Sequence, residues 1–192
     1  MPNLIYNLKL ITMKNYFFVL LIFLFSCEKP SDCDDHYFSD DFKSYVFADA
    51  GSQWIFQDTI LGITDTITIT LQEIQFNEEC SFSSQPHEVV EHTITSSYFV
   101  QEDGRLWHGR GDAQGDYYDG GYMLGFYYKD DNIYHDSLLV AGVWYKDVIE
   151  FSTDYVKFYR AKDIGVIKRK FEFFESSDTT YNFQLVSYVV IK

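Results

Sequence analysis

Alternation of apolar and polar side chains is the pattern that most restricts how this chain can fold. Residues 63–71 read Ile-Thr-Asp-Thr-Ile-Thr-Ile-Thr-Leu, so threonine fills one set of alternate positions and mainly apolar residues fill the other. Because successive side chains of a strand point to opposite faces, this segment predicts a β-strand with one buried and one wet face. Ile74 and Phe76 are out of phase with Leu71, which predicts a β-bulge or a break near Gln72.

Further segments with a strand pattern follow along the chain and are separated by turn residues. Residues 138–145 are apolar in both alternate sets of positions, so we expect a central strand there. Residues 109–121 contain five glycines and three aspartates, which predicts a loop. No segment of helical length shows an apolar period of 3.6 residues. The remaining expected strands span residues 53–61, 88–100, 105–110, 122–128, 149–161, 166–174 and 181–191.

Short successive strands with turns between them are typical of an antiparallel meander. Aromatic residues make up 19% of the chain, so both faces of such a sheet carry large apolar rings that need cover. We therefore expect one all-β domain over residues 43–192, formed by a single antiparallel meander sheet that is strongly curled into a barrel or half-barrel. A β-sandwich is the alternative. Curling also hides the edges of the sheet.

The first part of the chain has the pattern of a secretory signal. Lys14 precedes an apolar run over residues 16–25, which is shorter than the roughly 20 apolar residues that cross a membrane. The run ends in Leu24-Phe25-Ser26-Cys27, which resembles the lipobox of bacterial lipoproteins. The alternatives are an ordinary signal peptide and an uncleaved membrane anchor.

The lipobox resemblance implies a processed and lipidated protein. Residues 1–26 are then a signal peptide, with Met13 as the expected start of translation. Cys27 becomes the first residue and carries fatty acyl chains of the palmitate type. Several such chains hold a protein on a membrane, whereas one gives only marginal binding. We expect residues 27–42, which are polar and acidic, to form a lipidated tether.

Three segments resemble those of small uncharacterised lipoproteins of the Bacteroidota type. The acidic residues after Cys27 are similar to an outer-membrane export signal of this group. The other two segments are Phe47-Ala48-Asp49-Ala50-Gly51-Ser52-Gln53-Trp54-Ile55-Phe56 and Tyr159-Arg160-Ala161-Lys162-Asp163-Ile164-Gly165-Val166-Ile167-Lys168. The resemblance implies a lipid-anchored location in the outer membrane, with the periplasmic and the surface-facing side both open. It implies no activity.

The net charge and the cysteine content limit the kinds of partner and the redox state that we expect for this protein. The formal net charge is −14, which argues against binding nucleic acid because phosphate contacts need lysine and arginine. With Cys27 lipidated, Cys33 and Cys80 remain, and the cell envelope is oxidising enough for them to form a disulfide. The alternative is two free thiols. We expect the membrane, through the lipid anchor, and an unknown protein or small molecule as partners.

The glycine-rich segment holds the residues that suggest a binding site. Aromatic residues amid polar ones can stack on sugar rings or line an apolar pocket. Three aspartates near glycines are weak candidates for calcium, although their spacing does not match an EF-hand. The ligand candidates are Trp107, His108, Tyr117, Tyr118 and Tyr122, and the calcium candidates are Asp112, Asp116 and Asp119.

His87 and His92 lie in the segment His-Glu-Val-Val-Glu-His, which does not have the spacing of a helical zinc motif. On a strand the two histidines point to opposite faces, and we expect solvated side chains. The sequence contains no motif for a nucleophile, and we expect no cofactor. A non-catalytic binding domain is therefore the favoured function. The alternative is an envelope hydrolase, metal-assisted in one version, that uses His108 with Asp112 and Asp116.

Overall fold

The computed structural model describes residues 33–80, 85–99, 106–115, 117–128, 131–172 and 179–192. Cys27 lies outside these residues. The described chain contains two short helices and one antiparallel sheet of 11 strands. The helices are α2 (Asp40–Val46) and α3 (Gly121–Leu124). The strands are β1 (Gln53–Asp58), β2 (Ile63–Asn77), β3 (His87–Ser96), β4 (Trp107–Asp112), β5 (Tyr117–Gly120), β6 (Gly125–Tyr128), β7 (Ile133–Val140), β8 (Val143–Ser152), β9 (Val156–Ala161), β10 (Gly165–Glu172) and β11 (Thr180–Val189).

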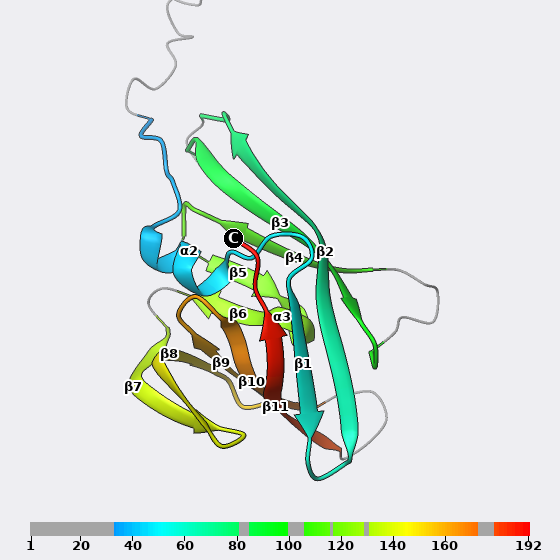
Figure 1. The fold of residues 1–192 in the computed structure, drawn as a ribbon. Coiled ribbons are helices and arrows are strands. Elements are labelled where there is room, and N and C mark those ends of the chain that lie inside the picture. Colours follow the sequence, from blue (N-terminus) through cyan, green and yellow to red (C-terminus); the bar gives the residue numbers. More distant parts are fainter. Residues whose placement is uncertain (1–32, 81–84, 100–105, 116, 129–130, 173–178) are drawn as a thin grey trace, which may run out of the picture.

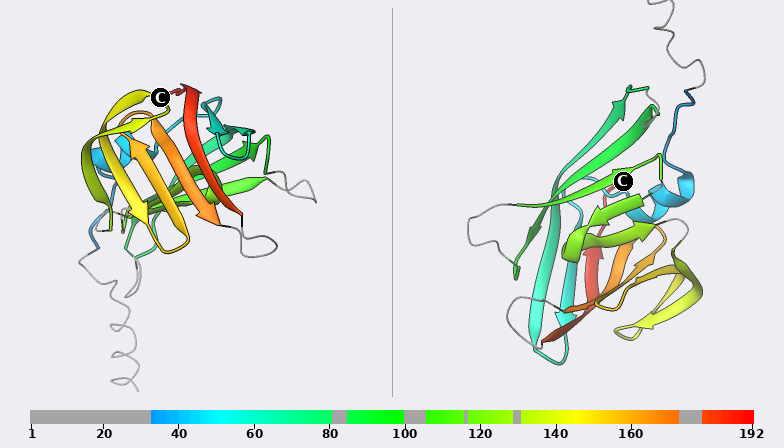
Figure 2. Two further views of the ribbon diagram at one scale, coloured as in Figure 1. Left: turned by 90° about the horizontal axis from the view of Figure 1, so that it is seen from below. Right: turned by 180° about the vertical axis from the view of Figure 1, so that it is seen from behind.

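The strand order is β6-β5-β4-β3-β2-β1-β11-β10-β9-β8-β7. Strands that follow one another in the sequence therefore pair with each other, except that β6 does not pair with β7. In addition, β11 returns to pair with β1. The sheet curls through 231° rather than a full turn, and its edges are β6 and β7 (Figures 1 and 2). These features confirm the expected all-β meander and its half-barrel form, and they exclude the sandwich.

The two halves of the half-barrel meet through close contacts of β6 with β9. Gly125 lies so near the ring of Phe158 that a Cβ atom would be 2.3 Å from its Cδ1 atom. The guanidinium of Arg160, also on β9, donates to the carbonyl oxygens of Leu124 and Gly125. A third donation, to the carbonyl of Tyr45, measures 3.1 Å and ties α2 to the same point. These contacts join β6, β9 and both helices inside the curled sheet.

Strand β2 shows why the threonine and isoleucine alternation was informative. Ile67 and Ile69 are fully buried, whereas Thr64 and Thr70 are exposed. The pairing register with β3 shifts between Ile69 and Leu71, which confirms a bulge close to the predicted position. The bulge turns the strand over, so Leu71 is exposed and not on the buried face as expected.

The prediction of a central strand over residues 138–145 is wrong. The segment is a hairpin that joins β7 to β8 at the edge of the sheet. Its turn consists of Ala141 and Gly142, whose φ angles are 49° and 83°, the left-handed conformations of a tight hairpin turn. The apolar residues of this segment do not share one environment, since Val140 is buried whereas Trp144 is exposed.

The prediction of a loop over residues 109–121 is also wrong for much of its length. Gly109 and Gly111 lie in β4, which pairs with β3 and β5. A Cβ atom on Gly109 would be 2.2 Å from the hydroxyl of Tyr118, and one on Gly111 would be 2.9 Å from Cγ1 of Val90. These glycines therefore allow close packing of the sheet against its core, and not a mobile loop.

Residues 33–42, expected as part of a tether, are packed against the folded domain. His36 and His87 form a parallel bridge. The amide of His36 donates to the carbonyl of Pro86 at 2.8 Å, and the amide of Glu88 donates to the carbonyl of His36 at 2.9 Å. Ser39 then caps α2 by accepting from the amide of Phe42. Apolar contacts with Phe38 and Phe42, both buried, complete the attachment. We call residues 33–38 the N-terminal strap.

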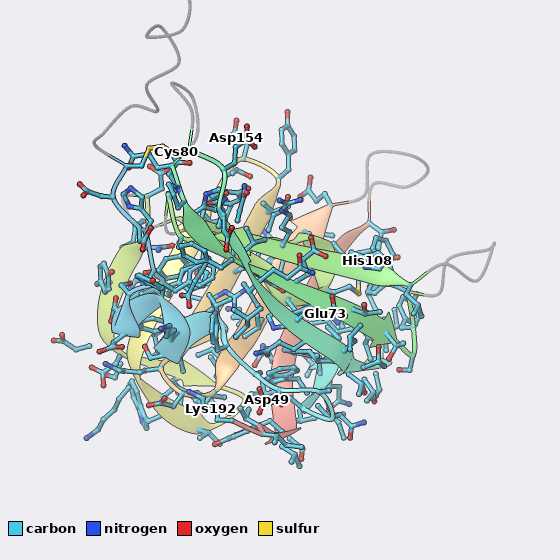
Figure 3. All side chains as sticks on the ribbon, turned by 90° about the horizontal axis from the view of Figure 1, so that it is seen from above. Asp49, Glu73, Cys80, His108, Asp154 and Lys192 are labelled. Atoms are coloured by element: carbon cyan, nitrogen blue, oxygen red, sulfur yellow. A yellow bond between two sulfur atoms is a disulfide. The ribbon has the colours of Figure 1, made fainter. Side chains whose placement is uncertain are left out.

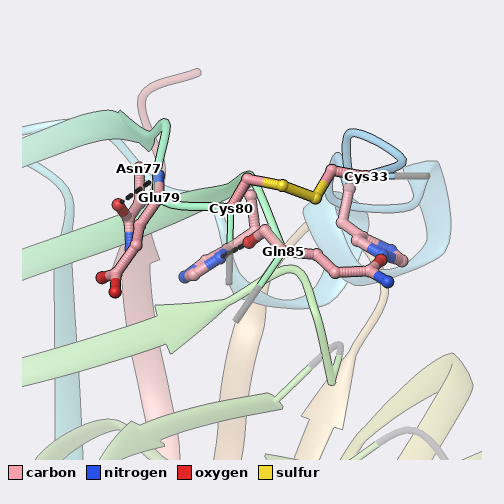
Figure 4. The surroundings of a disulfide bond; sticks show 7 residues. Cys33, Asn77, Glu79, Cys80 and Gln85 are labelled. Atoms are coloured by element: carbon pink, nitrogen blue, oxygen red, sulfur yellow. Dashed lines mark hydrogen bonds between the residues drawn. A yellow bond between two sulfur atoms is a disulfide. The ribbon is translucent and has the colours of Figure 1, made fainter. Parts of the chain in front are cut away.

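A disulfide fixes the start of the strap. Cys33 is bonded to Cys80, with Cα atoms 6.1 Å apart (Figure 4). Nearby, Nε2 of His36 lies 2.5 Å from Oε1 of Gln85, and the rings of Tyr37 and Phe76 stack at 5.5 Å. The strap is therefore held to the end of the β2 and β3 hairpin by covalent, polar and aromatic contacts together.

Candidate functional site

The structure does not gather the expected aromatic residues into a ligand-facing cluster. Tyr118 is fully buried, which contradicts its expected contact with a ligand. Trp107 is half-buried, and its indole N–H donates to the carbonyl of Phe99 at 2.8 Å. Tyr117 is half-buried, and the side chain of Tyr122 lies outside the described residues. The rings of Trp107, Tyr117 and Tyr118 are therefore partly or fully covered by the protein itself.

The expected calcium ligands are used locally. One carboxylate oxygen of Asp112 is 3.2 Å from Nε2 of His87, and the other accepts from the amide of Gln114 at 2.7 Å. Asp119 accepts from the amide of Gly121 at 2.8 Å, and Asp116 lies outside the described residues. Within the described residues, no group of three or more histidine, cysteine or acidic side chains is placed to hold a metal ion.

His108 and Asp112 do not form the pair that the hydrolase alternative requires. Both lie on β4, four residues apart, which corresponds to roughly 13 Å along a strand. His108 is exposed, whereas Asp112 is engaged with His87. Figure 3 places His108 on the opposite side of the domain from α2. The two side chains are therefore out of mutual reach.

His87 and His92 are both buried, so the expectation of solvated side chains is wrong. Nδ1 of His92 lies 2.9 Å from the hydroxyl of Tyr118, and Nε2 lies 3.1 Å from Oε1 of Gln72. This arrangement fits a neutral ring that donates from Nε2 and accepts at Nδ1. Burial, aided by the positive charge of Arg160, lowers the pKa of His92 to about 4. Burial also raises the pKa of Tyr118.

A second buried polar group surrounds Arg169, whose guanidinium forms an ion pair with Asp65. Both side chains are fully buried, and burial lowers the pKa of Arg169 to about 10, so the arginine stays charged at neutral pH. The guanidinium carbon also lies 4.5 and 4.6 Å from the ring centroids of Phe183 and Phe56. The sequence did signal this group, since Asp65 occupies the apolar face of the clearest strand.

Among the described residues, one groove that could take a ligand lies beside the β7 and β8 hairpin. It measures about 290 Å³. We call it the Trp144 groove. Its walls come from β8, from the turn between β9 and β10, and from β11, and its main residues are Val143, Trp144, Asp147, Lys162, Ile164 and Tyr188. The sequence pattern does not reveal this groove, because residues 138–145 have the pattern of one central strand.

Two aromatic rings and a tight backbone define the shape of this groove. Trp144 is 67% exposed and Tyr188 is 43% exposed, which is high for large aromatic side chains in a folded domain. The amide of Lys162 donates to the carbonyl of Asp147 at 3.1 Å, which joins the β9 and β10 turn to β8. Asp147 has a φ of 48°, so the chain turns sharply there. The groove wall is thus built on ordered backbone.

No protein family, curated protein or solved structure matches this chain.

No helix within the described residues is long and apolar enough to span a bilayer.

A second groove, of about 350 Å³, adjoins the first at Asp163 and runs along α2. Nζ of Lys192 lies 2.5 Å from the Asp163 carboxylate across its rim. This hydrogen bond lowers the pKa of Asp163. Phe47, its aromatic lining residue, packs partly against the core. The Trp144 groove is therefore the better candidate, because it alone of the two presents exposed rings.

Proposed function

We propose that this protein is a lipid-anchored protein of the cell envelope whose non-catalytic β-domain binds a ligand or partner in the Trp144 groove. The anchor is Cys27, and the membrane is the outer membrane. The observation that carries the binding part is the exposure of Trp144, at 67%, beside Tyr188 in one groove. Exposed aromatic rings that share one groove are typical of a binding surface, whereas single exposed apolar side chains are ordinary.

The form of the core supports binding rather than catalysis. His92, Tyr118 and Arg160 are buried and engaged with one another or with backbone carbonyls. A general base must reach a proton of a bound substrate, and these groups have no such exposure. The side chains around the Trp144 groove are lysines, aspartates, aromatic rings and the aliphatic Val143 and Ile164, which suit binding through apolar contact and hydrogen bonds.

The anchor is tested by changing Cys27 to Ser and following the protein through cell fractionation. We expect the variant to leave the membrane fraction because it cannot be acylated. Cys33→Ser is the matched control, since it also replaces a cysteine but leaves the lipobox intact, and it should remain with membranes. A Cys27→Ser protein that stays membrane-bound would refute the anchor.

The groove is tested by native mass spectrometry of the protein gently extracted from envelopes. We expect extra mass on the wild-type protein that is lost in Trp144→Ala. Ile60→Ala is the control, because Ile60 is 77% exposed on the turn between β1 and β2 and does not line the groove. If the two variants and the wild type carry the same bound mass, or if none carries any, the groove is not the binding site.

A further inference from the structure

We propose that the Trp144 groove binds a neutral saccharide, with the indole of Trp144 against one face of a sugar ring. This inference rests on the proposed function and names the ligand class of the same site. A pyranose ring presents axial C–H bonds on its faces and hydroxyl groups around its edge. A suitable site therefore needs an exposed aromatic face next to charged or polar groups.

The aromatic part of the site is present. Trp144 is the most exposed of the three tryptophans, since Trp54 is 2% exposed and Trp107 is half-buried. It follows Val143, which is also exposed, directly after the tight hairpin turn. The strand pairing of β7 with β8 continues through Trp144, which pairs with Leu139. The indole is thus presented from an ordered backbone, and holding it ready lowers the entropic cost of binding.

The polar part is present as well. The groove is lined by Lys146, Asp147 and Lys162 in addition to its rings. All three are exposed, and their side chains have no hydrogen-bond partner among the residues that the structure describes. Ammonium groups donate and carboxylates accept hydrogen bonds. A sugar hydroxyl does both, so it can satisfy either kind of group at the edge of the ring.

Local charge argues for a neutral ligand. The whole chain has a formal net charge of −14, which favours cations over anions near the protein. In the groove, however, Lys146 and Lys162 balance Asp147 and Asp163. Lys192, which pairs with Asp163, lines the neighbouring groove and not this one. A site for an anion would show excess positive charge and a site for a cation excess negative charge, and the groove shows neither.

The size of the groove argues against a protein partner. At about 290 Å³, the groove is just below the usual range for small-molecule sites, which is about 300–1,000 Å³. A stable protein partner would instead cover about 800 Å² of surface. The groove therefore suits one or a few sugar units, such as the end or a short stretch of a glycan chain.

The test is a titration of intrinsic tryptophan fluorescence with neutral saccharides. The probes are glucose, maltose, cellobiose and N,N′-diacetylchitobiose, and the protein is the chain from residue 28 onward. We expect at least one probe to give a saturable blue shift with a dissociation constant of about 1 mM or tighter. Trp144→Ala should abolish the shift, and Asp147→Asn should weaken binding by about tenfold, as expected for a lost charged hydrogen bond.

Trp107→Phe is the control, because it also removes an indole but leaves the groove unchanged, and it should retain wild-type binding. Ligand-observed NMR repeats each titration without relying on fluorescence. If no probe binds with a dissociation constant of about 1 mM or tighter in either measurement, the saccharide inference fails. A Trp144-dependent bound mass from envelopes would then still support the proposed function, whereas its absence would remove both.

Discussion

At the scale of single residues, the most unusual feature is a charged pair inside the curled sheet. Asp65 accepts from the guanidinium of Arg169, from the hydroxyl of Ser96 at 2.6 Å and from the amide of Tyr98 at 3.0 Å. The carboxylate is thus saturated with donors, which makes its burial tolerable. The guanidinium is enclosed by phenylalanine rings, including Phe183. Each group is stable in the core only because the other is there.

Replacing Asp65 with Asn should therefore destabilise the domain strongly. The change leaves Arg169 as a buried charge without its carboxylate, which typically costs about 3–5 kcal/mol of unfolding free energy. Urea denaturation measures this loss. Asp163→Asn is the control, because it breaks the exposed pair with Lys192, and exposed pairs contribute about 0–1 kcal/mol. Equal effects of the two variants would contradict this account of the core.

His92 should make the domain sensitive to acid. Its pKa is about 4 in the folded state and about 6.5 in the unfolded chain. Between these values the unfolded state binds more protons, so stability is full above pH 6.5 and falls as the pH is lowered toward 4. A shift of this size corresponds to about 3 kcal/mol. Chemical denaturation at a series of pH values measures the slope.

The variant His92→Gln tests whether this residue is the cause. It removes the titrating ring and should flatten the dependence of stability on pH between about 6.5 and 4. His108→Gln is the matched control, since His108 is exposed, and it should keep the wild-type slope. An unchanged slope in His92→Gln would assign the acid sensitivity to other groups.

At the scale of elements, the glycines of β4 show how packing decides structure. Gly111 sits between β3 and β5 and faces Phe42 of α2. A Cβ atom there would be 2.9 Å from Val90, 3.0 Å from the carbonyl oxygen of Tyr117 and 3.1 Å from the Phe42 ring. The strand, the neighbouring strands and the helix can approach one another only because this position has no side chain.

Gly111→Ala should therefore destabilise the domain by about 1–3 kcal/mol, the usual cost of overpacking a core. This loss exceeds the small gain that alanine normally brings over glycine in a strand. Thermal or urea denaturation measures it. Gly115→Ala is the control, because its nearest contact would be 3.4 Å, an ordinary van der Waals distance. A Gly111→Ala protein as stable as the wild type would show that α2 moves without cost.

At the scale of the whole molecule, the N-terminal strap fixes the point on the domain to which the residues before Cys33 are joined. The disulfide binds Cys33 to Cys80, and Figure 3 places Cys80 and Lys192 on opposite sides of the domain. Cys27 is six positions before Cys33, and six extended residues span at most about 20 Å. Under the proposed anchoring, the strap therefore holds the domain close to the membrane by its Cys80 side.

Removing the disulfide with Cys33→Ser and Cys80→Ser together should destabilise the domain by about 2–4 kcal/mol. The upper value follows from the chain-entropy model for a sequence separation of 47 residues. Urea denaturation measures the loss, and hydrogen exchange should be faster at the amides of His36 and Glu88. Reductant should reproduce the effect in the wild type and leave the double variant unchanged. A loss confined to the strap, with global stability intact, would contradict this prediction.

The sequence by itself determined the class of fold. The period-two pattern requires strands because a strand alone places alternate side chains on opposite faces, and the short turns between successive strands require antiparallel pairing. The bulge in β2 also followed from the phase change after Leu71. These features depend only on neighbouring residues, so they are visible without the rest of the molecule.

Only the tertiary structure decided which side of each strand is covered and what lies on the surface. Trp144 and Val140 belong to one apolar segment, yet the first is exposed and the second buried, because the segment turns back at Ala141. Tyr118 is buried since Arg160 and His92 reach it from distant strands. Burial and binding surfaces depend on contacts between residues far apart in the chain, and no local pattern encodes these.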